Sequence, residues 1–178
     1  MGLFFDVLSA INDPNQSGSV EQLGTVMDSA KQLGAASGLE ASTLQTVMSS
    51  LGGALFPALK QQSLAPGGNQ VLSSIVNQVA GVGVSSGATA MPSFITPELQ
   101  QQIVQAMAQK TGLNAGLLQS ILPGLISTVL GFLGMGAPKP GVAGVNPILN
   151  AVLDGNHDGN TDLGEVFKFA NRFLNVPS

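Results

Sequence analysis

The sequence predicts an all-α protein: two repeated helical hairpins packed as a bundle, followed by a C-terminal helix–loop–helix unit. No stretch alternates apolar and polar residues with period two, whereas several stretches place apolar residues at i, i+3, i+4 and i+7, which is typical of amphipathic helices. One helical pattern occurs twice, at an offset of 74 residues. An acidic twelve-residue segment lies near the C-terminus.

The chain starts with a predicted helix whose apolar side carries Phe4, Val7, Leu8 and Ile11. The first hairpin follows at residues 19–60. Its start signal is a capping box, in which the side chains of Ser19 and Gln22 satisfy backbone N–H groups of the first helical turn. A candidate helix at about residues 70–82 and a Gly/Ser/Ala/Thr-rich connector at 83–90 lead to the second hairpin.

The repeat is clearest at the turn of each hairpin. Residues 38–45, G-L-E-A-S-T-L-Q, align with residues 112–119, G-L-N-A-G-L-L-Q. The second copy spans residues 95–133 and starts with Thr96 as N-cap and Pro97 at the first helical position. A single helical hairpin cannot bury its apolar stripe alone, so we expect the two copies to pack together with pseudo-twofold symmetry.

An uncharged segment between Lys110 and Lys139 is long enough to span a bilayer. Pro123 and several hydroxyl and amide side chains interrupt it, and its flanks show no positive-inside bias. The chain also has no Trp or Tyr to form an interfacial belt. We therefore expect a buried core helix, and membrane association is not favoured.

A Pro/Gly-rich linker, residues 134–145, is predicted to separate a helical repeat domain, residues 1–133, from a C-terminal segment, residues 146–178. In that segment, residues 154–165 read D-G-N-H-D-G-N-T-D-L-G-E and fit the pattern D-x-[DN]-x-[DN]-G-x5-E of an EF-hand calcium loop. Gly159 stands where such a loop turns through a conformation that a side chain resists.

Calcium takes six to eight oxygen ligands, and this spacing brings six oxygen donors to one point. The predicted side-chain ligands, at loop positions 1, 3, 5, 9 and 12, are Asp154, Asn156, Asp158, Asp162 and Glu165. Asn160, at position 7, would offer its backbone carbonyl. The predicted cofactor is therefore Ca²⁺.

The segment resembles an EF-hand with two departures. Thr161 stands where an aliphatic residue usually pairs with a second loop, and no second D-x-N-x-D-G occurs in the chain. The hand is therefore predicted to be unpaired, as in dockerin-type modules rather than calmodulin-type sensors. A simpler alternative stays open: Asp162 and Glu165 form a capping box for the following helix, and the residues before them form an ordinary Asx/Gly-rich turn.

Five of the eight phenylalanines lie near the chain ends, at Phe4, Phe5, Phe167, Phe169 and Phe173. Large aromatic side chains dominate core energetics, so the N-terminal helix is a candidate seat for the exiting helix of the hand. Calcium would then fasten the two ends together. The alternatives are that each terminal helix packs separately, or that one docks on a neighbouring molecule.

The surface is predicted to be nearly uncharged. Charged residues make up 9% of the chain, against about 25% in typical soluble domains. Four of the ten acids lie in the predicted loop, which leaves six acids and six bases elsewhere. Because a neutral surface resists association weakly, we expect a homo-oligomer or a docked protein partner; the alternative is a monomer kept soluble by amides and hydroxyls. The basic residues are scattered, so we expect no nucleic-acid partner.

Catalysis is not expected. The only histidine, His157, lies inside the predicted calcium loop, the chain has no cysteine, and no nucleophile, base and orienting group stand in a recognisable set. The N-terminus lacks a basic region before its apolar stretch, which Asp6 interrupts, so a cytoplasmic location is expected.

Three stretches carry a family resemblance: the opening M-G-L-F-F-D-V-L-S-A-I-N, the L-P-G-L at residues 122–125 within the repeated hairpins, and the closing D-L-G-E-V-F-K-F-A-N-R-F-L. Together they resemble a YidB-like bacterial helical family of unknown function, in a cyanobacterial version with a C-terminal EF-type loop. The resemblance implies an all-helical bacterial protein and supplies no activity.

Two functions from different classes follow from these observations. The first is a calcium-binding scaffold protein that assembles through uncharged helical surfaces, with the ion ordering the hand. The second is a calcium-responsive module that docks a protein partner or membrane surface. The lone hand and Thr161 favour the first.

Overall fold

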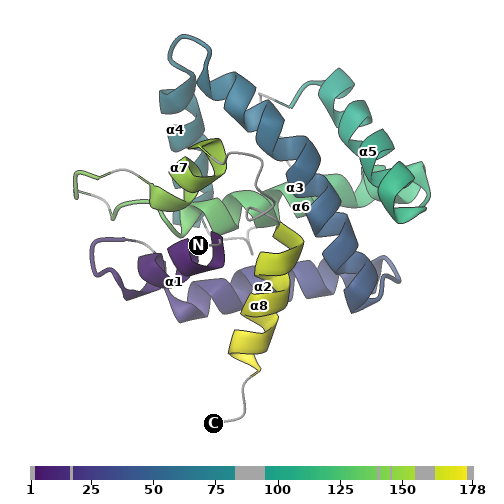
Figure 1. Ribbon diagram of the computed structural model, residues 1–178, viewed down its shortest axis with the longest axis horizontal. Helices are drawn as coiled ribbons and strands as arrows, with labels where there is room; N and C mark the ends of the chain where they lie inside the picture. The colour runs from purple at the N-terminus through teal and green to yellow at the C-terminus, as the bar shows by residue number, and fades with distance from the viewer. Residues whose placement is uncertain are drawn as a thin grey trace.

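The computed structural model of the chain is all-helical in the part that it describes (Figure 1). The described residues are 3–16, 18–82, 95–139, 141–144, 146–154 and 163–175. They form eight α-helices and no β-strand, so the predicted all-α class is confirmed for them. In chain order the helices are α1 (Leu3–Asn12), α2 (Val20–Ala36), α3 (Ala41–Ser63), α4 (Gly68–Val82), α5 (Pro97–Thr111), α6 (Ala115–Gly134), α7 (Pro147–Asp154) and α8 (Leu163–Leu174).

The predicted start signals cap the first helix of each hairpin. At α2, the backbone N–H of Gln22 donates to Ser19 Oγ at 3.1 Å. At α5, the N–H of Leu99 donates to Thr96 Oγ1 at 3.2 Å, and Pro97 is the first helical residue. Each hydroxyl thus satisfies one of the N–H groups that the first helical turn leaves without a partner.

The turns of the two hairpins have matching geometry. Gly38 follows α2 with φ 68°, and Gly112 follows α5 with φ 70°. α3 then begins at Ala41 and α6 at Ala115, each three residues after its glycine. A left-handed backbone at this position suits glycine because a side chain there would meet the following carbonyl oxygen.

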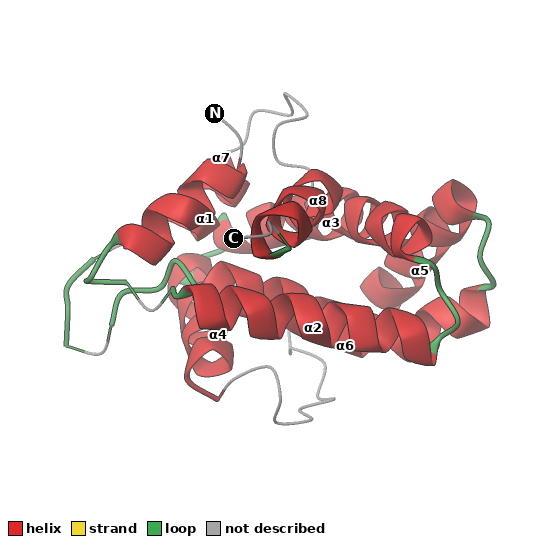
Figure 2. Cartoon of the chain, turned by 90° about the horizontal axis from the view of Figure 1, so that it is seen from below, coloured by secondary structure: helices red, strands yellow, loops and turns green. Residues whose placement is uncertain are grey.

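Each hairpin packs on the other rather than mainly on itself. α2 lies against α6, and α3 lies against α5, while α4 covers α6 and α3. Figure 2 shows α2 and α6 running side by side. Their approach is close: a Cβ on Gly124 of α6 would lie 2.9 Å from Leu33 Cδ2 of α2. A glycine at this position therefore sets the spacing between the two helices.

The described part of the predicted linker, residues 134–145, is fastened to the body of the protein. Its Lys139 N–H donates to the Asn15 carbonyl oxygen at 2.9 Å, and Pro138 forms an isolated antiparallel bridge with Gln16. Met135, just after α6, is fully buried. These contacts hold the exit of α6 against the connection between α1 and α2.

One hydrophobic core runs through all eight described helices, and both helices that flank the predicted calcium loop belong to it. α8 contributes Leu163, Val166 and Ala170, and α7 contributes Ile148, Leu149 and Val152. Of the described helices, α6 has the length and apolar composition to cross a membrane, and 61% of its most apolar stretch is buried inside the protein. Burial on this scale matches the expected core helix.

Candidate calcium-binding loop and the helix that follows it

The predicted loop joins α7 to α8. Asp154, at loop position 1, is the last residue of α7, and Glu165, at position 12, is an exposed residue in the first turn of α8. The other four predicted ligands lie outside the described residues: Asn156, Asp158, Asn160 and Asp162. The described flanks thus have the order of a helix–loop–helix, with the first and last predicted ligands at the two helix ends.

The start of α7 depends on Asn146, which sequence reasoning missed. The N–H of Leu149 donates to Asn146 Oδ1 at 3.0 Å, so Asn146 caps the helix. Its Nδ2 also donates to the Leu133 carbonyl oxygen at 2.7 Å, near the end of α6. Asparagine directly before Pro147 and an apolar run was the available signal, since proline favours the first helical position. The entering helix is therefore both capped and tied to α6.

Both helices that flank the predicted loop pack on α1 and α3. α7 packs on α1 and α3, and α8 packs on α3, α2 and α1. The first and last predicted ligands are thus carried by helices that share a base.

The buried side of α8 lies over α2, α3 and α6. Leu163, Val166 and Ala170 are buried, and a Cβ on Gly52 of α3 would lie 3.1 Å from Leu163 Cδ1. The exposed side of α8 carries Glu165, Lys168, Phe169, Arg172 and Phe173. The helix is thus strongly amphipathic, and its position on the bundle follows from its apolar stripe.

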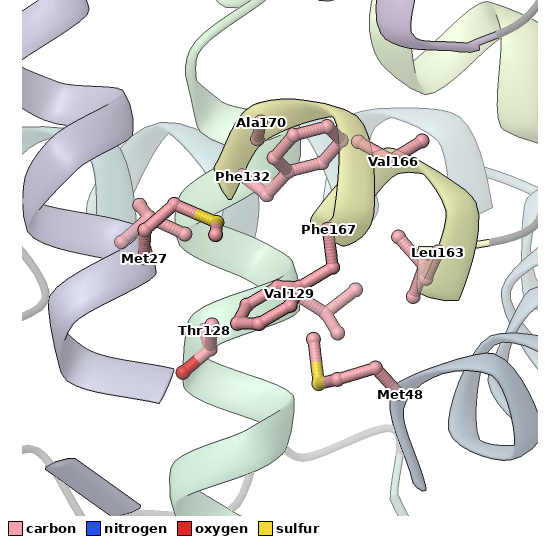
Figure 3. Close-up of a pocket in the computed structure, with 10 residues that line it drawn as sticks. Met27, Met48, Thr128, Val129, Phe132, Leu163, Val166, Phe167 and Ala170 are labelled. Atoms are coloured by element: carbon pink, nitrogen blue, oxygen red, sulfur yellow. The ribbon is translucent and has the colours of Figure 1, made fainter. Parts of the chain in front are cut away.

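A small apolar pocket of about 20 Å³ lies beneath α8 (Figure 3). It is lined by Val26, Met27, Met48, Thr128, Val129, Phe132, Leu163, Val166, Phe167 and Ala170. The Phe167 ring extends from α8 toward Val129 of α6, with Met27 and Met48 contributed by α2 and α3. The hydroxyl of Thr128 already donates to the Gly124 carbonyl oxygen at 2.9 Å. The pocket is therefore a packing defect under α8, without the convergent polar groups of a substrate site.

The two chain ends meet through aromatic side chains. The Phe4 ring of α1 lies 5.7 Å from the Phe169 ring and 6.4 Å from the Phe173 ring of α8, measured between centroids. The Phe5 ring lies 6.4 Å from Phe4 in an edge-to-face arrangement. Of the arrangements left open by the sequence, the structure has the terminal helices in contact within one chain.

Among the described residues, no group of three or more His, Cys, Asp or Glu side chains gathers to hold a metal. Four of the six predicted ligands lie outside that part of the chain, so the ligand set stays a prediction. No protein-family model, curated protein or solved structure matches this chain. Function is therefore inferred from the chain's own residues.

Proposed function

We propose that this chain is a calcium-binding scaffold protein that self-assembles through uncharged helical surfaces, with calcium ordering the C-terminal hand. The observation that carries the proposal is the twelve-residue stretch 154–165, which fits every defined position of the EF-hand pattern. The end of α7 at Asp154 and the place of Glu165 in the first turn of α8 support it.

In this proposal calcium acts on order rather than on chemistry. An ion held by ligands from Asp154 to Glu165 would join the end of α7 to the start of α8, and both helices pack on α3. A ligand that binds only the folded hand stabilises it by about 2.7 kcal/mol when its concentration is 100 times its Kd. The ion would therefore hold α8 against the bundle.

The proposal includes the finer arrangement of the bundle. A pseudo-twofold axis would exchange α2 with α5 and α3 with α6, and would turn the α2–α6 contact into the α5–α3 contact. Both contacts are present, and the Gly38 and Gly112 turns match within 2° in φ, the difference between 68° and 70°. These observations support two copies of one hairpin that bury each other's apolar stripes.

The rest of the proposal follows from composition. Six acids and six bases outside the loop leave little net charge to keep copies apart, which favours assembly. The lack of any histidine or cysteine outside the loop argues against an enzyme. The proposal also includes a cytoplasmic location, because the N-terminus lacks a basic region before its apolar stretch, and kinship with YidB-like proteins, because three stretches of the chain resemble that family.

The alternative is a calcium-responsive module that exposes an apolar face to a protein partner or membrane. The described structure favours the scaffold, because the apolar side of α8 is already buried on α2, α3 and α6. Sedimentation with calcium and with chelator separates the two. Assembly under both conditions supports the scaffold, whereas a calcium-triggered change in size supports the responsive module.

Calorimetric calcium titration tests the site. Glu165→Gln removes the bidentate carboxylate at loop position 12, so we expect calcium affinity to fall by about tenfold or more. Glu98→Gln is the matched control, because Glu98 is also an exposed glutamate in the first turn of a helix, α5, far from the loop in sequence. Equal affinities for both variants, or no calcium binding by the unmodified protein, would overturn the proposal.

A further inference from the structure

The face formed by α1 and the exposed side of α8 carries three exposed phenylalanines. The exposed fractions are 58% for Phe5, 45% for Phe169 and 42% for Phe173. They surround the partly buried Phe4, whose ring is within 6.4 Å of each of the other three. Isolated exposed apolar residues are normal, but a contiguous aromatic patch marks a surface that another molecule covers.

The exposed side of α8 is one unbroken stripe. Its members are at i, i+3, i+4, i+7 and i+8 of the helix: Glu165, Lys168, Phe169, Arg172 and Phe173. Side chains at this spacing share a single helix face. α8 therefore presents a continuous mixed surface, charged and aromatic, along its whole length, while its other side is buried in the bundle.

The charges on this stripe are ordered so that it complements a reversed copy of itself. Glu165 lies near the start of α8 and Arg172 near its end, seven residues apart. When two copies of the helix pair antiparallel about a twofold axis between Lys168 and Phe169, each Glu165 faces Arg172 of the second copy. Among the described residues of its own chain, neither Lys168 nor Arg172 makes an ion pair.

We propose that the face made of Phe5, Glu165, Lys168, Phe169, Arg172 and Phe173 is where a second copy of this chain docks, through an antiparallel, twofold α8–α8 contact. The inference rests on the self-assembly in the proposed function and assigns it to a mixed aromatic and charged surface in place of an uncharged one. In the pair, Phe169 of one copy lies across from Lys168 of the other, which places each cation beside an aromatic ring. The interface is isologous, so the assembly closes as a dimer.

The aromatic rings, rather than the ion pairs, supply most of the affinity. Central aromatic side chains dominate the binding energy of interfaces, whereas exposed ion pairs contribute little and mainly fix orientation and register. Glu165 is also the last predicted calcium ligand, so calcium would draw it out of its pairing with Arg172. Because that pairing is weak, the dimer persists in calcium and weakens by a few-fold at most.

Sedimentation velocity across a concentration series in chelator measures the dimer without calcium. Phe169→Ser removes the ring next to the axis, and we expect the dimer Kd to rise by about tenfold or more. Leu64→Ser is the matched control, because Leu64 is 77% exposed and lies outside this face, at the C-cap of α3. Circular dichroism checks that both variants keep their helices. Equal weakening by both variants, or by neither, would overturn the proposal.

A charge exchange tests the antiparallel register. In chelator, Glu165→Arg and Arg172→Glu each place like charges across the axis, so each single variant should weaken the dimer by about three- to tenfold. The double variant restores opposite charges at both ends and should return the Kd to within about twofold of the unmodified protein. Additive weakening in the double variant contradicts this register, since it shows that the two positions do not meet.

The remaining outcomes assign a failure to one proposal or the other. If the protein sediments as a monomer at all concentrations, the α8–α8 dimer is overturned, and calorimetry still tests calcium binding separately. Loss of calcium binding with an intact, Phe169-dependent dimer removes the calcium site and keeps the inference. Sedimentation of the monomer with vesicles of anionic phospholipid, abolished by Phe169→Ser, identifies the face as a lipid surface and overturns the second copy as its occupant.

Discussion

The two hairpins share a turn but differ in what surrounds their second helices. α3 and α6 each begin three residues after a left-handed glycine, Gly38 or Gly112. α6 is covered by α2, α4 and α5, whereas α3 is covered by α5, α4 and the two helices that flank the predicted loop, α7 and α8. A repeated sequence thus sets the same backbone turn twice, while the partner of each helix depends on the rest of the chain. The first hairpin has the more extensive contact with the hand, through α3 and α2, whereas the second touches it through α6, at the Asn146–Leu133 hydrogen bond and the pocket beneath α8.

The largest expected effect comes from the core leucines that occupy equivalent positions in the two hairpins. Leu51 and Leu125 are both fully buried, 74 residues apart. Truncating a buried leucine removes apolar contact and leaves a cavity, so Leu51→Ala and Leu125→Ala should each lower the free energy of unfolding by about 2–5 kcal/mol. Urea unfolding measures both. If only one of the two variants lowered the free energy of unfolding, the two leucines would not be equivalent in the two hairpins.

A substitution of intermediate effect probes the close contact between α3 of the first hairpin and α8. Gly52 of α3 faces Leu163 of α8, so Gly52→Val overpacks this contact and should cost about 1–3 kcal/mol in unfolding free energy. Gly53→Val is the matched control, since Gly53 is the next residue and is exposed. Valine forms helix better than glycine, so the control should be neutral or stabilising. Equal losses for the two variants would contradict the close packing of α8 on α3.

The smallest expected effect compares the two turns. Gly38→Ala and Gly112→Ala each force a side chain into the left-handed region, at a cost of about 1–2 kcal/mol. Nothing lies within 4 Å of a Cβ at either position, so no clash with other residues adds to the backbone strain. Thermal unfolding of the two variants should therefore give similar shifts. If only one of the two variants lost stability, the two turns would share a backbone geometry without making the same contribution to stability.

Much of the fold could be predicted from local signals. Ser19, Thr96 and Pro97 marked where α2 and α5 begin, and the absence of period-two stretches excluded a sheet-rich fold. Such signals are readable because a helix start depends on hydrogen bonds between near neighbours. The loop pattern was readable for a similar reason, since its ligands follow each other within twelve residues.

The pairing of helices could not be predicted in the same way. Apolar stripes attract without direction, so the sequence did not indicate that α2 lies on α6, and it left open whether the N-terminal helix seats the exiting helix of the hand, as Phe4 beside Phe169 now shows. Asn146 makes one local hydrogen bond, to Leu149, and one to Leu133, which lies 13 residues away. The start of α7 could therefore be predicted from the adjacent Asn146 and Pro147, whereas the hydrogen bond from Asn146 to Leu133 of α6 could not.

The central claim is that calcium binds the loop and so stabilises α8 on α3, and thermal unfolding with calcium and with chelator tests it most directly. At 100 times its Kd, calcium should raise the melting temperature of the unmodified protein and of Glu98→Gln by about 5–10 °C. Glu165→Gln, measured at the same calcium concentration, should lose most of that shift. The same rise in Glu165→Gln, or no rise in the unmodified protein, would contradict the account.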